Sequence, residues 1–316
     1  MTSVLMGTDD GLLQAGAGEP RPIALAGHTV TGLSRGDDGW WAIVDRGELW
    51  HSQADPHHWE RRTHSVEPEA TCLLPTAGGL LVGTAEAGLA WLRPADEGDA
   101  GDRAGALEPV AGFERVEGRD QWYTPWGGPP DTRWLSAAGA TLFANVHVGG
   151  IITSADGGRS WQPTGLDLHA DVHQVLAGAA PDLVLAPCAE GLAVSTDHGR
   201  TWRIDDEGLH ATYSRAVAVA VTVAGDTVVI SASTGPRTDR SALYRRPLHA
   251  DGAFERCRAG LPEWFTANID TGCLVAHGAT VACATVDGVF GSTDGAATWQ
   301  ALAEPLAPVH CLALAG

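Results

Sequence analysis

The stretch Ile152-Thr-Ser-Ala-Asp-Gly-Gly-Arg-Ser-Trp161 decides the fold, because two close copies of it recur downstream. The copies are Ser195-Thr-Asp-His-Gly-Arg-Thr-Trp202 and Ser292-Thr-Asp-Gly-Ala-Ala-Thr-Trp299. The shared pattern is Ser-x-Asp-x-Gly-x-x-Trp, with Ala296 at the Gly place of the last copy. A short acidic side chain can accept hydrogen bonds from the backbone that follows it, and glycine adopts a left-handed conformation without steric cost. The pattern therefore predicts a tight hairpin turn followed by an aromatic anchor.

This pattern resembles the Asp-box (BNR) repeat of sialidase-like β-propellers. The resemblance implies a propeller built from repeated four-stranded sheets. It does not fix the activity, since propellers with this repeat include glycosidases, receptor ectodomains and assembly factors.

Seven repeats account for the whole chain, and they predict an all-β, seven-bladed β-propeller of four-stranded blades in one domain, 1–316. A short turn between the second and third strands of each blade serves as the ruler. The expected blades are 309–316 with 1–27, 28–67, 68–120, 128–168, 169–209, 210–261 and 262–307. The strand Val309–Leu314 completes the N-terminal blade, because closing the ring with both termini removes exposed sheet edges.

The composition agrees with this fold and disfavours two classes of binding partner. The chain of 316 residues contains 40 Gly and 18 Pro, which favours short strands and turns over helices. A formal net charge of −19 disfavours nucleic-acid and membrane binding, because both require a basic face. The N-terminus lacks a signal-peptide pattern, so we expect a cytoplasmic protein. The six cysteines have no CxxC spacing and are expected to be buried, reduced thiols.

Two segments interrupt the repeat. The acidic, Gly/Ala-rich segment Pro94–Gly105 is expected to be a surface loop. The segment Gln121–Pro130 combines aromatic residues with prolines, so we expect a stiff loop with apolar surface where blade four begins.

The face opposite the three turns, which we call the upper face, is where propellers usually bind ligands over the axial channel. Each innermost strand is expected to place one side chain at the upper end of this channel. These side chains are Thr31, Thr71, Arg133, His173, Arg215, Gly272 and His310. Two arginines and two histidines in one ring form a positive site within an acidic protein, so we expect a functional pocket there.

Loops between the second and third strands and between blades bring further side chains to this rim. Our first hypothesis is a site that binds a small polar or anionic molecule, with a chemical transformation of that molecule left open. The residues expected to bind it are Arg133, Arg215, Arg237, Trp126, Trp264 and His310. The residues expected to handle protons or catalysis are His147, His173, His210, Tyr213 and Asp270. No cofactor is predicted.

The sialidase resemblance implies specific parts: an arginine triad, a tyrosine nucleophile with a supporting glutamate, an aspartate acid/base, and an early Phe-Arg-Ile-Pro segment. The segment is missing from this sequence. Arg133 and Arg215 lie on the ring with Arg237 as a third candidate, while Tyr213 and Asp270 could mimic the nucleophile and the acid. We therefore do not expect sialidase activity, and two opposed glycosidase carboxylates are not visible either.

Two alternatives stay open. The upper face could instead present a surface to a protein partner, as in assembly factors of this fold. It could also hold copper, iron or zinc, because the imidazoles of His147, His173, His210 and His310 could converge near the axis. Nearby arginines would oppose such a metal site.

Overall fold

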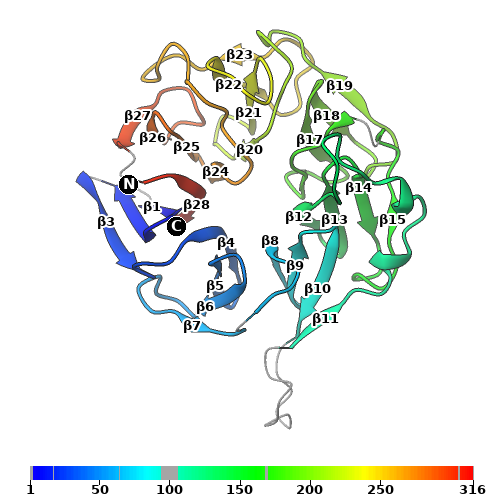
Figure 1. Cartoon of the computed structure of the whole chain (residues 1–316). Coiled ribbons are helices and arrows are strands. Elements are labelled where there is room, and N and C mark those ends of the chain that lie inside the picture. The colour runs from blue at the N-terminus through cyan, green and yellow to red at the C-terminus, as the bar shows by residue number, and fades with distance from the viewer. Residues whose placement is uncertain are drawn as a thin grey trace.

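The computed structural model describes residues 3–16, 18–63, 65–93, 106–167, 170–304 and 307–315. Seven four-stranded antiparallel sheets stand around a central axis (Figure 1). The predicted seven-bladed all-β propeller is confirmed. The predicted loop Pro94–Gly105 lies outside the described residues.

Each blade runs from its innermost strand outward, and the blades follow one another along the chain. The strands of blade one are β28 (Val309–Ala315), β1 (Ser3–Thr8), β2 (Gly11–Gly16) and β3 (Gly18–Ala24). Those of blade two are β4 (Val30–Gly36), β5 (Gly39–Val44), β6 (Glu48–Ser52) and β7 (Glu60–Arg61). Those of blade three are β8 (Ala70–Thr76), β9 (Gly79–Thr84), β10 (Gly88–Leu92) and β11 (Leu107–Pro109).

Two short 3-10 helices, η1 (Phe113–Arg115) and η2 (Arg119–Gln121), precede blade four. The strands of blade four are β12 (Thr132–Ala138), β13 (Thr141–Val146), β14 (Gly150–Ser154) and β15 (Gln162–Pro163). Those of blade five are β16 (Leu176–Ala177), β17 (Val184–Cys188), β18 (Gly191–Ser195) and β19 (Arg203–Asp205). Those of blade six are β20 (Val217–Ala220), β21 (Thr227–Ser233), β22 (Ser241–Pro247) and β23 (Glu255–Arg256). Those of blade seven are β24 (Leu274–His277), β25 (Thr280–Thr285), β26 (Gly288–Ser292) and β27 (Gln300–Ala303).

The last strand closes the ring, as the sequence predicts. Strand β28 pairs with β1, so that Leu312 lies opposite Met6 and Leu314 opposite Val4. Both ends of the chain therefore lie in one blade (Figure 1). Leu312 is buried among residues of blades one and seven, so this strand also joins the two blades.

The middle strands of the blades are buried on both faces because each blade is covered by two neighbours. Every residue of β5, β17, β18 and β26 is buried. These strands therefore read as continuous apolar runs rather than as alternating patterns. The outermost strands β7 and β15 are exposed.

The three repeated turns join third to fourth strands, between β14 and β15, β18 and β19, and β26 and β27. Asp156 accepts hydrogen bonds from the Arg159 and Ser160 amides and from the Ser154 and Ser160 hydroxyls, at 2.7–3.0 Å. These bonds, those from Ser160 above all, lower the pKa of Asp156 to about 2. Asp197 and Asp294 make the same set of bonds. The turns are therefore held by the carboxylate.

All six cysteines are buried and unpaired, as expected. Among the described residues, no helix has the length and apolar character needed to cross a membrane.

Candidate functional site

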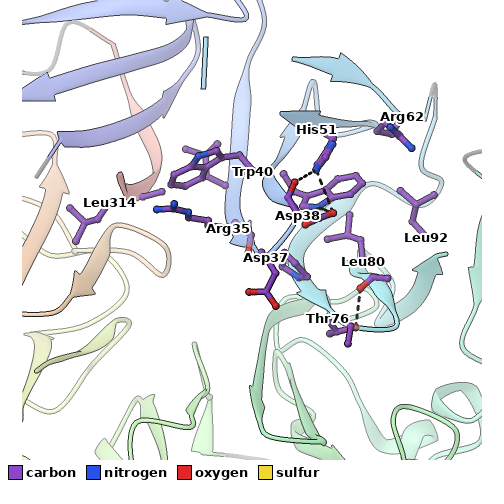
Figure 2. Close-up of a pocket in the computed structure, with 18 of the residues that line it drawn as sticks. Arg35, Asp37, Asp38, Trp40, His51, Arg62, Thr76, Leu80, Leu92 and Leu314 are labelled. Carbon is purple, nitrogen blue, oxygen red and sulfur yellow. Dashed lines mark hydrogen bonds and ion pairs between the residues drawn. The ribbon is translucent and has the colours of Figure 1, made fainter. Parts of the chain in front are cut away.

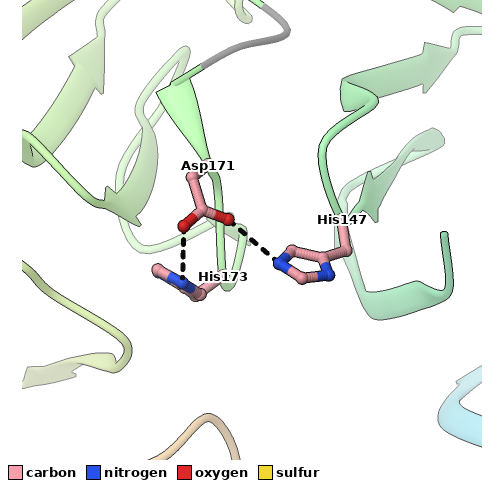
Figure 3. A group of neighbouring side chains, drawn as sticks. All are labelled: His147, Asp171 and His173. Carbon is pink, nitrogen blue, oxygen red and sulfur yellow. Dashed lines mark ion pairs between the residues drawn. The ribbon is translucent and has the colours of Figure 1, made fainter. Parts of the chain in front are cut away.

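An aspartate between two histidines forms the centre of the candidate site (Figure 3). The Asp171 carboxylate lies 3.0 Å from His147 Nε2 and 3.5 Å from His173 Nε2. Both imidazoles are buried. His147 follows β13 of blade four, whereas Asp171 and His173 precede β16 of blade five. The site is therefore assembled across a blade interface.

Backbone bonds fix these side chains at the upper face, opposite the three repeated turns. The His147 amide donates to the Asp131 carbonyl at 3.0 Å, and the His173 amide donates to the Pro187 carbonyl at 3.0 Å. The buried Asn145 amide group donates to the Val172 carbonyl at 3.0 Å and so joins the two segments. Asp171 itself has a φ of 50°, a conformation that non-glycine residues rarely adopt.

Arg133 determines which ring nitrogen of a neutral His147 carries the proton. Its Nη2 lies 3.2 Å from His147 Nδ1. A guanidinium can only donate, so Nδ1 must accept and the single proton of a neutral His147 ring must sit on Nε2. That N–H faces Asp171, although the contact with Asp171 Oδ1 misses hydrogen-bond geometry and leaves this oxygen buried without a hydrogen bond.

His173 connects Asp171 to a tyrosine. Its Nδ1 lies 2.8 Å from the Ser214 carbonyl, which can only accept, so Nδ1 carries a proton. Its Nε2 lies 3.0 Å from the Tyr213 hydroxyl. Burial lowers the pKa of His173 and outweighs the opposing effect of Asp171. In the neutral ring Nε2 accepts a hydrogen bond from the Tyr213 hydroxyl. Arg215 Nη2 donates a hydrogen bond to the Tyr213 oxygen at 3.4 Å.

The two arginines differ in their partners. Arg215 forms an ion pair with Asp270 and donates to the Pro236 carbonyl at 3.3 Å. Burial alone would lower the pKa of Arg215, but Asp270 raises it. For Arg133, burial lowers the pKa and the charge of Arg215 lowers it further. Among the described residues, no carboxylate forms an ion pair with Arg133 within 4.0 Å.

Both histidines face the carboxylate of Asp171. Burial would raise the pKa of Asp171, but its contacts with His147 and His173 prevail and hold it far below the usual range. The carboxylate is therefore ionised at neutral pH.

The structure brings together six of the predicted site residues. They are Arg133, His147, His173, Tyr213, Arg215 and Asp270. Trp126 joins them at the rim, with its ring centroid 5.1 Å from that of His147, although the side chain is 70 % exposed.

The other predicted residues lie apart from this group. His210 and Trp264 pack on each other at 4.6 Å between ring centroids, and His210 Nδ1 lies 2.9 Å from the Tyr244 hydroxyl. His310 contacts Asp9 at 2.7 Å. Arg237 is exposed on the loop between β21 and β22. Of the four histidines in the metal hypothesis, His147 and His173 lie together, whereas His210 and His310 contact other partners in the described residues.

Sequence reasoning missed Asp171. The spacing Asp171-Val-His173 is the sequence signal for it, since residues two apart in an extended segment point to one side. An alignment of one channel position per blade contains His173 but not Asp171.

The pair of histidines with an aspartate also raises the question of a metal. The three ligand atoms of His147, Asp171 and His173 lie within 4.8 Å of one another, and a two-histidine, one-carboxylate set suits iron. A ligating histidine normally donates its second ring N–H to an acceptor, as His173 does to Ser214. His147 instead faces the donor Arg133, which favours a hydrogen-bonded relay over a metal.

A cavity of about 1500 Å³ opens at the other end of the channel, on the face of the repeated turns (Figure 2). Its lining includes Arg35, Asp38, His51 and Trp134. None of the predicted site residues lines it. In this cavity His51 contacts Asp38 at 3.4 Å, and the Trp41 indole N–H lies 3.3 Å from the same carboxylate. We take the upper site as the candidate functional site, because the described residues provide no carboxylate within 4.0 Å of Arg133 there.

Trp134 separates the two ends of the channel. It follows Arg133 on β12 and lines the lower cavity. Its ring also reaches Gly272 of blade seven, where an added Cβ atom would lie 3.4 Å from it. The indole therefore crosses the channel below the upper site.

No protein-family model matches the sequence, and no curated protein matches it. Solved structures with the same fold include a GH74 enzyme of Niastella koreensis, with a TM-score of 0.59, 14% identity and coverage of 88% of this chain and 46% of that one. A GH74 xyloglucanase from Xanthomonas campestris has a TM-score of 0.58 and 15% identity, covering 89% of this chain and 46% of that one.

U3-55K has a TM-score of 0.60 and 14% identity, covering 91% of this chain and 85% of its own. The chain spans less than half the length of the GH74 structures that it matches. At these identities the likeness shows the fold alone: the chain is similar to seven-bladed propellers that include glycoside hydrolases.

Proposed function

We propose that the upper axial site binds a small anionic molecule, such as a carboxylate or phosphate, and exchanges a proton with it. The observation that carries this proposal is Arg133, a largely desolvated cation for which the described residues provide no carboxylate within 4.0 Å. Desolvating a charge with no opposite charge in contact is costly, and a bound anion would compensate it. Arg215 lies close enough to lower the pKa of Arg133. Together the two guanidiniums could bind one anionic group bidentately.

The proton path runs from Tyr213 to His173. The Tyr213 hydroxyl donates to His173 Nε2 at 3.0 Å, and His173 Nδ1 is anchored on the Ser214 carbonyl. If Tyr213 gives its proton to His173, the resulting imidazolium faces Asp171 and the phenolate faces Arg215. Each charge formed thus has an opposite charge beside it, which is what general acid–base catalysis requires. Trp126 covers His147 at the rim and would form one wall.

A thermal-shift panel of small carboxylates and phosphates tests this proposal, because a ligand that binds only the folded state raises the melting temperature. At least one anion should stabilise the wild-type protein and lose this effect in Arg133→Gln. Arg159→Gln, an exposed arginine on a repeated turn, is the matched control and should respond like the wild type. Equal stabilisation of Arg133→Gln and wild type would refute the proposal.

A non-catalytic surface for a protein partner is the second candidate. It is favoured by Trp126 and Tyr123, which are 70 % and 51 % exposed in the stiff loop before blade four. Exposed aromatic residues are enriched where proteins associate. Under this alternative Trp126→Ala abolishes partner capture, while no anion in the panel stabilises the protein.

We also propose a propeller family and a cellular location for the protein. The three aspartate-held turns support membership of the Asp-box propellers. The six buried, unpaired cysteines support a reducing, cytoplasmic location.

A further inference from the structure

Three arginines lie near one another on the rim of blade six, and two of them contact an aromatic side chain. Arg240 ends the loop between β21 and β22, Arg256 lies on β23, and Arg258 follows it. The guanidinium carbons of Arg256 and Arg240 lie 3.6 Å and 4.8 Å from the ring centroid of Trp264. His210 packs on the same indole. We call these five residues the rim cluster.

Within the part of the chain that the structure describes, the arginines of the rim cluster differ from their neighbours in having no carboxylate partner. On the same blade Arg245 pairs with Glu255 at 3.5 Å, and Arg246 pairs with Asp205. For Arg240, Arg256 and Arg258, the described ranges contain no carboxylate within 4.0 Å, and Glu263 acts on Arg256 only at longer range. Three unneutralised cations in one place are unusual in a protein with a net charge of −19.

The positive charges repel one another at this place. Burial lowers the pKa of Arg256, and Arg258 and Arg240 lower it further. The Arg256 Nε atom is buried and has no hydrogen-bond partner among the described residues. Such an arrangement costs stability in the free protein unless an anion neutralises it.

The donors of the rim cluster are held in place before any ligand binds. Two guanidiniums are positioned by contact with the Trp264 ring, which limits their rotamers. The Tyr244 hydroxyl accepts the His210 amide at 3.2 Å and lies 2.9 Å from His210 Nδ1. When His210 Nδ1 accepts a hydrogen bond from the Tyr244 hydroxyl, the proton of the His210 ring lies on Nε2. This Nε2 lies 3.4 Å from the Arg240 carbonyl.

From this geometry we infer that the rim cluster is a second anion site, distinct from the axial site, which binds a multiply charged phosphate-type oxyanion. Three guanidiniums carry more charge than a single carboxylate would balance. Their planar donor pairs match the oxygens of phosphate groups. Trp264 offers an apolar edge beside the charges, which suits an organic phosphate.

Calorimetric titration with inorganic pyrophosphate tests the site. The titration uses Arg133→Gln protein, so that the axial arginine pair does not contribute to the heat. Adding Arg256→Gln or Arg240→Gln should weaken the binding at least about tenfold, since each removes a hydrogen bond to a charged group. Arg245→Gln is the matched control, because Arg245 is already paired with Glu255, and it should leave the affinity unchanged.

A second measurement uses the wild-type protein. Pyrophosphate should shift the imidazole NMR resonances of His210, which packs on Trp264, and the shift should vanish in Arg256→Gln. The inference is overturned if pyrophosphate produces neither heat in Arg133→Gln nor a shift of His210. It is also overturned if Arg245→Gln weakens binding as much as Arg256→Gln does.

Discussion

Replacing Tyr213 by phenylalanine tests whether the relay at the upper site exists as the structure describes it. The substitution removes one hydroxyl and leaves the ring, so packing changes little. It removes the bond to His173 Nε2 at 3.0 Å and the acceptor of Arg215 Nη2 at 3.4 Å. His173 has only 1% of its side chain exposed, so water cannot easily replace the lost donor.

The expected magnitude follows from this burial. Leaving a buried acceptor without a partner costs about 1–3 kcal/mol. Tyr244→Phe is the matched control, because Tyr244 makes an equivalent bond to His210 at 2.9 Å. His210 is exposed, so water can take over the bond and the loss should be about 0.5–1.5 kcal/mol. Tyr213→Phe should therefore destabilise the protein more than Tyr244→Phe does.

Urea unfolding followed by tryptophan fluorescence measures both losses, and an unchanged m-value in each variant confirms that the free energies are comparable. The reasoning is refuted if Tyr213→Phe costs no more than Tyr244→Phe. That result would mean that the buried His173 Nε2 does not depend on the tyrosine hydroxyl.

Two further predictions concern the closing strand and the central carboxylate. Leu312→Ala should destabilise the protein by about 2–5 kcal/mol through loss of buried contacts between blades one and seven, lowering the melting temperature by about 3–8 °C in a chain of this length. The exposed Val223→Ala serves as the control, and a shift no larger than the control's would contradict ring closure by β28. Because the folded-state pKa of Asp171 lies below its unfolded value, its contribution to stability is present above about pH 4 and is lost as the pH falls toward the folded-state pKa. The difference in melting temperature between wild type and Asp171→Asn should thus be constant near neutral pH and shrink in acid, and a difference that persists unchanged to pH 2 would speak against it.

The sequence by itself determined the architecture, because the fold depends on local, repeated chemistry. Each Ser-x-Asp-x-Gly-x-x-Trp turn is stabilised by hydrogen bonds within a few residues, as the bonds to Asp156 show. Turns of this kind mark the junction of third and fourth strands in three blades, and short turns between second and third strands repeat along the whole chain. Blade count, strand order and the face of each loop therefore follow from spacing. The same logic placed Arg133, His147, His173, Tyr213 and Arg215 at one end of the ring.

Only the tertiary structure decided which of these side chains meet. The distance from His147 to Asp171, or from His173 to Tyr213, spans a blade interface, and it depends on how neighbouring sheets tilt and pack. Chain spacing carries no such information. For the same reason the sequence could not tell that His210 and Trp264 turn outward to the rim of blade six, because the connections that carry them are long enough to reach either place. The height of a side chain along the axis is set within its own blade. Whether side chains of neighbouring blades touch depends on the assembled ring.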